Sequence, residues 1–106
     1  MRDIHALARQ IANNFHPEKI ILFGSYAYGK PRSESDVDLL VVMDSSVRNV
    51  QQAVQISRAL DYHFGLELLV RNSRQLQDRI ALGDYFLREI VEKGKVLYAR
   101  ADNRVD

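Results

Sequence analysis

Two short motifs in this chain carry residue types that could bind a phosphorylated ligand. Gly24 and Ser25 end one apolar run, and Asp36 and Asp38 open the next one. A glycine allows close approach of the backbone, while a serine hydroxyl and the free N–H groups of a following helix can bind phosphate oxygens. The pattern therefore predicts a phosphate pocket beside two carboxylates.

The spacing of the two aspartates predicts that their carboxylates lie on one side of a strand. Side chains two positions apart on a strand point to the same face, with their Cβ atoms roughly 6–7 Å apart. Asp36 and Asp38 would repel each other at the start of a buried strand, and a divalent cation would remove that cost. Hard oxygen ligands with polyphosphate as co-ligand suit Mg²⁺. The alternative reading is a turn with a capping serine and two solvated aspartates.

Apolar patterning predicts the strands that must position these residues. Strands are expected over residues 20–23, 37–43 and 66–70. The second of them is apolar on both faces, so we expect it to be central and covered on both sides. Residues 96–98 form either a small final strand or an extended tail.

Helical periodicity predicts helices in the segments between the strands. Helices are expected over residues 3–15, from a Ser25 cap to near Gly29, and over about 47–60 with Ser45 or Ser46 as cap. Two more are expected, one after a Ser73 cap with Leu76 and Ile80, and one from about Phe86 to a stop at Gly94. Strands that alternate with helices predict an α/β fold. Residues 101–106 are expected to be frayed.

Composition narrows the classes of protein and of site. The 106 residues fit one domain over 1–106, and a net charge of +1 argues against non-specific nucleic-acid or membrane-surface binding. There is no cysteine, which excludes disulfides and thiolate metal sites. No apolar run reaches transmembrane length and no signal peptide is recognisable, so a cytoplasmic protein is expected.

The motifs resemble those of a known family. Residues 23–25 (Phe-Gly-Ser) and 36–39 (Asp-Val-Asp-Leu) resemble the signature of the DNA polymerase β-type nucleotidyltransferase superfamily. More narrowly, the chain is similar to the minimal nucleotidyltransferases, the MNT antitoxins that accompany HEPN-domain toxins, over nearly its whole length. The resemblance implies a nucleotidyltransferase fold, α/β (α+β), with a small mixed β-sheet flanked by helices.

The resemblance also implies a third carboxylate on the next strand, and Glu67 is the only acidic residue in 64–70. The family usually carries Asp there, so the longer Glu makes direct metal coordination and a general-base role depend on geometry. The alternative is an edge-strand Glu that points into solvent. Tyr26 and Tyr28 stand where the family often has Arg, and they could stack on a base, line a partner surface or pack the short helix.

The resemblance implies an enzyme that transfers AMP from Mg·ATP to a tyrosine of a HEPN toxin and so acts as its antitoxin. Gly24 and Ser25 would bind the phosphates, and Asp36 and Asp38 would hold one or two Mg²⁺. Glu67 would complete the second metal site and help deprotonate the attacking hydroxyl. The expected partners are the toxin and the nucleotide, in a homo- or hetero-oligomer, with no membrane or direct nucleic-acid contact.

Two alternatives stay open at this point. The chain could be a non-catalytic antitoxin that neutralises its partner by binding. It could also transfer a nucleotide to a small molecule such as an aminoglycoside, which would need an acceptor pocket that a chain of this length is poorly able to build.

Overall fold

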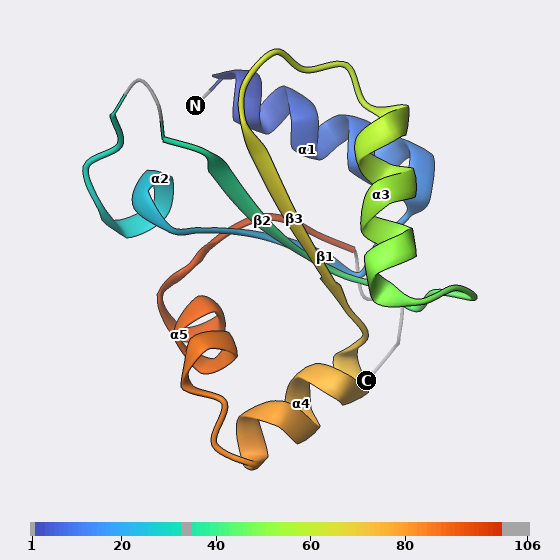
Figure 1. Cartoon of the computed structure of the whole chain (residues 1–106), viewed down its shortest axis with the longest axis vertical. Coiled ribbons are helices and arrows are strands. Elements are labelled where there is room, and N and C mark those ends of the chain that lie inside the picture. Colours follow the sequence, from blue (N-terminus) through green and yellow to red (C-terminus); the bar gives the residue numbers. More distant parts are fainter. Residues whose placement is uncertain (1, 33–34, 101–106) are drawn as a thin grey trace.

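The computed structural model describes residues 2–32 and 35–100 of the chain. The helices are α1 (Arg2–Phe15), α2 (Ser25–Tyr28), α3 (Asn49–Ala59), α4 (Ser73–Ala81) and α5 (Tyr85–Lys93). The strands are β1 (Lys19–Phe23), β2 (Val37–Val42), β3 (Leu66–Arg71) and β4 (Lys95–Ala99). They form one mixed sheet in the order β3-β2-β1-β4 with helices on both sides (Figure 1), which confirms the predicted fold class.

The central strand of the candidate site is β2, as predicted. It pairs antiparallel with β1 on one side and parallel with β3 on the other. All of its residues except Asp38 are buried. A parallel pair needs a long crossover, and α3 supplies it between β2 and β3.

The two faces of the sheet are covered by different helices. One buried cluster joins Leu39 to Ile56 of α3 and includes α1, and the other joins Leu40 to Leu87 of α5. In Figure 1, α1 and α3 lie on one side of the sheet, and α4 and α5 lie on the other. Alternate residues of a strand point to opposite faces. Asp38 therefore lies on the face that carries α5 and α4.

The predicted cap of α4 is wrong by one residue. Asn72, not Ser73, is the N-cap: its side chain accepts a hydrogen bond from the Gln75 backbone N–H at 2.7 Å, and the Gln75 side chain accepts from the Asn72 N–H at 3.1 Å. The Ser73 hydroxyl instead donates to Glu18 Oε2 at 3.0 Å. Both residues are of capping type, but only Asn72 caps the helix, and Ser73 is the first helical residue.

The predicted cap of α3 is also wrong, because this helix begins only at Asn49. The Ser45 hydroxyl lies 2.8 Å from Oε1 of Gln52, a buried polar side chain whose oxygen thereby obtains a donor. The backbone N–H of Arg48 donates to the Gln51 side chain at 3.3 Å. Ser45 therefore stabilises the loop before α3 rather than the helix end.

Residues 96–98, for which the sequence allowed either a strand or an extended tail, belong to strand β4, which pairs antiparallel with β1. Gly94 ends α5 as predicted, with its N–H donating to Ile90 O at 2.8 Å.

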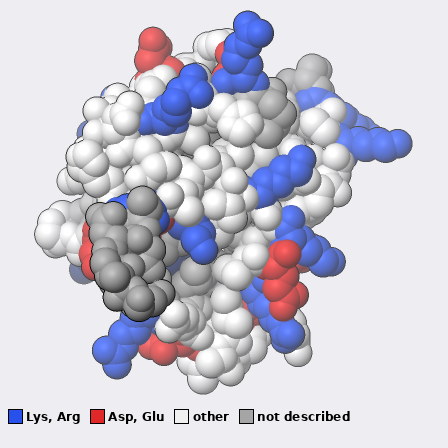
Figure 2. Space-filling view, turned by 180° about the vertical axis from the view of Figure 1, so that it is seen from behind, with Lys and Arg blue, Asp and Glu red and all other residues white. Residues whose placement is uncertain are grey.

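The predicted frayed segment 101–106 lies outside the described residues. None of the described helices has the length and apolar character needed to cross a membrane. On the face seen in Figure 2, basic side chains are spread over the surface, and at the lower right some of them lie beside acidic side chains.

Candidate active site

The turn from β1 into α2 places Gly24 in a backbone conformation that favours glycine. Its φ is 74°, in the left-handed region that side chains disfavour, and its carbonyl oxygen accepts from the N–H groups of Ala27 at 3.0 Å and Tyr28 at 3.1 Å. Gly24 is therefore the N-cap of α2, and the expectation that Ser25 caps this helix is wrong. Ser25 is the first residue of α2 and directly follows Gly24, so it lies where the turn meets the helix.

Gly24 has a second reason to lack a side chain. In the register of β1 with β2, Phe23 lies opposite Asp38. A Cβ built on Gly24 would overlap Oδ2 of Asp38 and lie 3.1 Å from its Cγ. The Asp38 carboxylate therefore packs directly against the Gly24 backbone, so the two motifs seen in the sequence meet across adjacent strands.

Glu67 lies beside Asp38 on the other flank of β2. The two residues are register partners in the parallel pair of β2 with β3. The pKa of Asp38 is raised to about 6, first by burial, then by the charge of Glu67 and a hydrogen bond with its side chain, and last by the charge of Asp36. Glu67 is exposed, but the register and its effect on the pKa of Asp38 place its carboxyl group beside that residue.

The comparison with known proteins agrees with this geometry. Residues 6–103 match the family described as polymerase beta, nucleotidyltransferase. The chain belongs to this nucleotidyltransferase family. A candidate protein adenylyltransferase from Methanocaldococcus jannaschii is 36% identical over 81 residues, which cover 76% of this chain and 78% of the relative.

Two solved structures share the fold at low sequence identity. A candidate nucleotidyltransferase from Sulfolobus solfataricus has a TM-score of 0.64 and 20% identity, and the match covers 93% of this chain and 79% of that one. A toxin–antitoxin crystal structure with AMP-PNP has a TM-score of 0.58 and 24% identity over 91% of this chain and 73% of that one. Both likenesses establish the fold of this nucleotidyltransferase.

Gly65 is a residue of the candidate site that the sequence analysis did not identify. A Cβ on Gly65 would overlap Oδ1 of Asp36 and lie 2.9 Å from its Cγ, so the Asp36 carboxylate occupies that space. The φ of Gly65 is not positive, which means that space rather than backbone conformation calls for glycine. The Gly65 carbonyl also accepts from the Val37 N–H at 2.8 Å. Only the β2–β3 register reveals this contact, because the sequence shows just one more glycine before a strand.

The predicted metal ligands fit a cation in their chemistry. Asp36, Asp38 and Glu67 offer hard oxygen donors. Burial, and after it the neighbouring charges of Glu67 and Asp36, raise the pKa of Asp38, and a bound cation would offset both effects. Within 2–32 and 35–100, however, no group of three or more acidic or histidine side chains is arranged to hold a metal ion. The structure joins Asp38 to Glu67 and seats Asp36 against Gly65, so the three-ligand metal site stays a prediction.

The two tyrosines of α2 differ in their surroundings. Tyr26 is half-buried against the core cluster on the α1 and α3 side of the sheet, which favours a packing role. Tyr28 is 44% exposed and free to meet a ligand or a partner.

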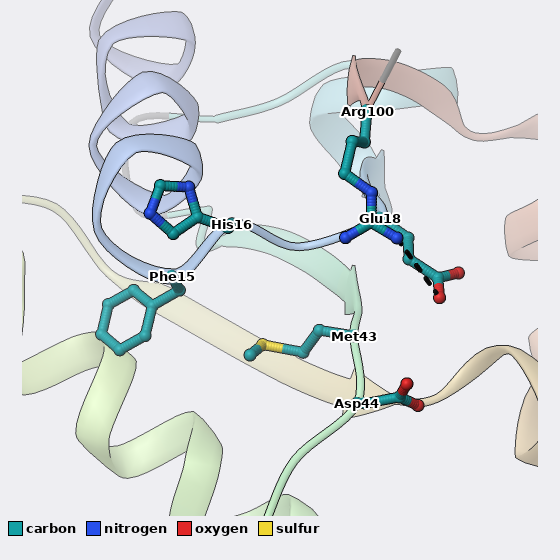
Figure 3. Close-up of a pocket in the computed structure, with 6 residues that line it drawn as sticks. All are labelled: Phe15, His16, Glu18, Met43, Asp44 and Arg100. Carbon is teal, nitrogen blue, oxygen red and sulfur yellow. Dashed lines mark ion pairs between the residues drawn. The ribbon is translucent and has the colours of Figure 1, made fainter. Parts of the chain in front are cut away.

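A separate cavity of about 140 Å³ lies at the other end of β2 (Figure 3). Met43 and Asp44 line it just after β2 ends, and the Glu18–Arg100 ion pair, 3.8 Å long, lies at its edge. Asp36 and Asp38 are at the opposite end of this strand. The cavity therefore does not belong to the candidate active site.

Proposed function

We propose that this nucleotidyltransferase transfers AMP from Mg·ATP to a hydroxyl group of a partner protein and thereby acts as an antitoxin. The observation that carries the proposal is the position of Asp38, which packs against the Gly24 turn on one side and meets Glu67 on the other. In the reaction the acceptor oxygen would bond to the α-phosphorus. The bond from that phosphorus to the pyrophosphate oxygen would break, and the acceptor proton would pass to a carboxylate.

Each motif has a role in this proposal. Gly24 and Ser25 would bind phosphate oxygens through the backbone N–H groups and the hydroxyl of the turn. Asp36 and Asp38 would hold one or two Mg²⁺, which when bound would stabilise charge on the α-phosphate and the leaving pyrophosphate. Glu67 would accept the acceptor proton, since its position opposite Asp38 in the β2–β3 register places its carboxylate beside the proposed metal ligands.

The acceptor class is inferred from the relatives. One of them is named for protein adenylyl transfer, and another is a toxin–antitoxin structure with a nucleotide analogue. We infer that the acceptor is a tyrosine of a HEPN-domain toxin and that this toxin is the partner. We further infer that residues 1–106 act as one minimal nucleotidyltransferase domain.

Mass spectrometry of the intact partner tests this function. The chain is incubated with the HEPN toxin of a neighbouring reading frame, ATP and Mg²⁺, and the toxin should gain the mass of one AMP on a tyrosine. Asp38→Asn should abolish the gain, whereas Asp44→Asn, the same substitution beyond the other end of β2, should preserve it. An active toxin that gains no mass with the wild-type chain would count decisively against AMP transfer.

A second candidate function follows from Glu67, which is longer than the usual family Asp and is exposed. If its carboxylate does not reach the reacting atoms, the chain would neutralise the toxin by binding alone. The double variant Asp36→Asn, Asp38→Asn separates the two functions. Full neutralisation by this variant, at equal expression, would show that binding is sufficient.

A further inference from the structure

An aromatic ring stands exposed on the same side of the sheet as Asp38. Phe86, in the first turn of α5, is 55% exposed, whereas its neighbour Leu87 is buried. The Phe86 ring contacts the buried ring of Phe23 edge to face, with centroids 5.7 Å apart and an interplanar angle of 84°. One side of Phe86 is thus anchored, and the rest of the ring meets solvent.

The start of α5, and with it the backbone of Phe86, is fixed by a side-chain cap. Asp84 Oδ1 accepts from the Leu87 backbone N–H at 3.0 Å, and Asp84 Oδ2 lies 3.4 Å from Nη2 of Arg79. These contacts tie the first turn of α5 to the end of α4. The exposure of Phe86 is therefore a property of a well-anchored turn.

The register of the sheet connects Phe86 to the candidate active site. Phe23 lies directly opposite Asp38 in the antiparallel pair of β1 with β2, and the side chains of directly opposite residues share a face. Asp38, Phe23 and Phe86 therefore follow one another across the face that α5 covers. The Phe86 ring stands on the order of 10 Å from the Asp38 carboxylate, given the usual separation of cross-strand neighbours.

We propose that Phe86 is the base-stacking residue of this nucleotidyltransferase and that its ligand is the purine ring of the bound nucleotide. The inference builds on the proposed function, which places the phosphates at Gly24 and Ser25. A ribose separates those phosphates from the base, and Phe86 is linked to this turn through Phe23, which directly precedes Gly24. An aromatic ring with a free surface binds a base by stacking. Tyr26 is less suited to this role because it packs on the other side of the sheet.

Calorimetric titration with two probes tests the inference. Mg·ATP carries the base, and inorganic tripolyphosphate with Mg²⁺ carries only the phosphates. Phe86→Leu keeps an apolar contact for Phe23 but removes the ring, and it should weaken ATP binding about tenfold while leaving tripolyphosphate binding unchanged. Phe86→Trp should restore ATP binding. Leu82→Ala is the matched control, since Leu82 is 81% exposed in the neighbouring turn and should affect neither probe.

The outcomes separate this inference from the proposed function. Unchanged ATP affinity in Phe86→Leu, or an equal loss for both probes, would overturn the stacking role while nucleotide binding stands. Unchanged ATP affinity together with slower transfer to the toxin would assign Phe86 to the protein acceptor instead, which also overturns the inference. If the wild-type chain binds neither probe, the nucleotide site itself is refuted and the stacking role with it.

Discussion

Replacement of Asp38 by Asn should stabilise the protein when no metal is present. The structure places the Asp38 carboxylate against Gly24 and beside Glu67, where burial and neighbouring negative charge raise its pKa from 3.8 to about 6. That difference sets a ceiling of about 3 kcal/mol on the penalty for ionising Asp38 in the folded state. Because the carboxylate keeps contact with solvent, screening lowers the expected gain in the variant to about 1 kcal/mol.

The pH dependence has a defined direction. A carboxyl group whose pKa is higher in the folded state binds its proton more tightly there, so its stabilising contribution is complete below 3.8 and is lost as the pH rises through about 6. Asp38→Asn should therefore match the wild type near pH 4. At pH 8 it should melt about 4–8 °C higher, as expected for 1 kcal/mol in a domain of this size.

Thermal unfolding in EDTA at both pH values is the measurement. Asp44→Asn is the control, because it makes the same substitution at an exposed position just beyond the other end of β2. An Asp38→Asn variant that is no more stable than the wild type at pH 8 would refute the reasoning about crowded carboxylates. A gain of equal size at pH 4 would also refute it, since the gain would then not arise from charge.

Three further predictions concern the site and the fold. Gly65→Ala should displace the Asp36 carboxylate and lower the AMP-transfer rate at least about tenfold, a loss of about 1.4 kcal/mol, while circular dichroism shows an intact fold. Saturating Mg·ATP should stabilise the wild type by about 2.7 kcal/mol at a hundredfold excess over its Kd, and neither EDTA-treated protein nor Asp38→Asn should show this rise in Tm. Urea unfolding should show a loss of about 1 kcal/mol for Asn72→Ala and a smaller one for Ser73→Ala, because only Asn72 caps α4; equal losses would contradict that cap assignment.

Local patterns were sufficient to predict most of the elements. The apolar runs and helical spacing located β1, β2, β3, α1 and α5 to within about two residues, because these signals depend on neighbours close in the chain. The caps were less predictable. Asn72 and Ser73 are both of capping type, and local sequence does not distinguish them, whereas in the structure Asn72 caps α4 and Ser73 bonds to Glu18, 55 residues away in the chain.

The sequence by itself determined the chemistry of the candidate site. The two motifs lie near the ends of apolar runs, with Gly24 and Ser25 in one and Asp36 and Asp38 in the other. That local arrangement was enough to predict a phosphate pocket beside two carboxylates. Their spacing also carried the resemblance to the nucleotidyltransferases, which the family match confirms.

Only the tertiary structure decided how these residues meet. The β1–β2 register packs Asp38 against Gly24, and the β2–β3 register brings Glu67 to Asp38 and reserves space at Gly65 for Asp36. The contact of Phe86 with Phe23 likewise joins residues far apart in the chain. Register and helix docking are set by the packing of both sheet faces together, and no local pattern of residues contains that information.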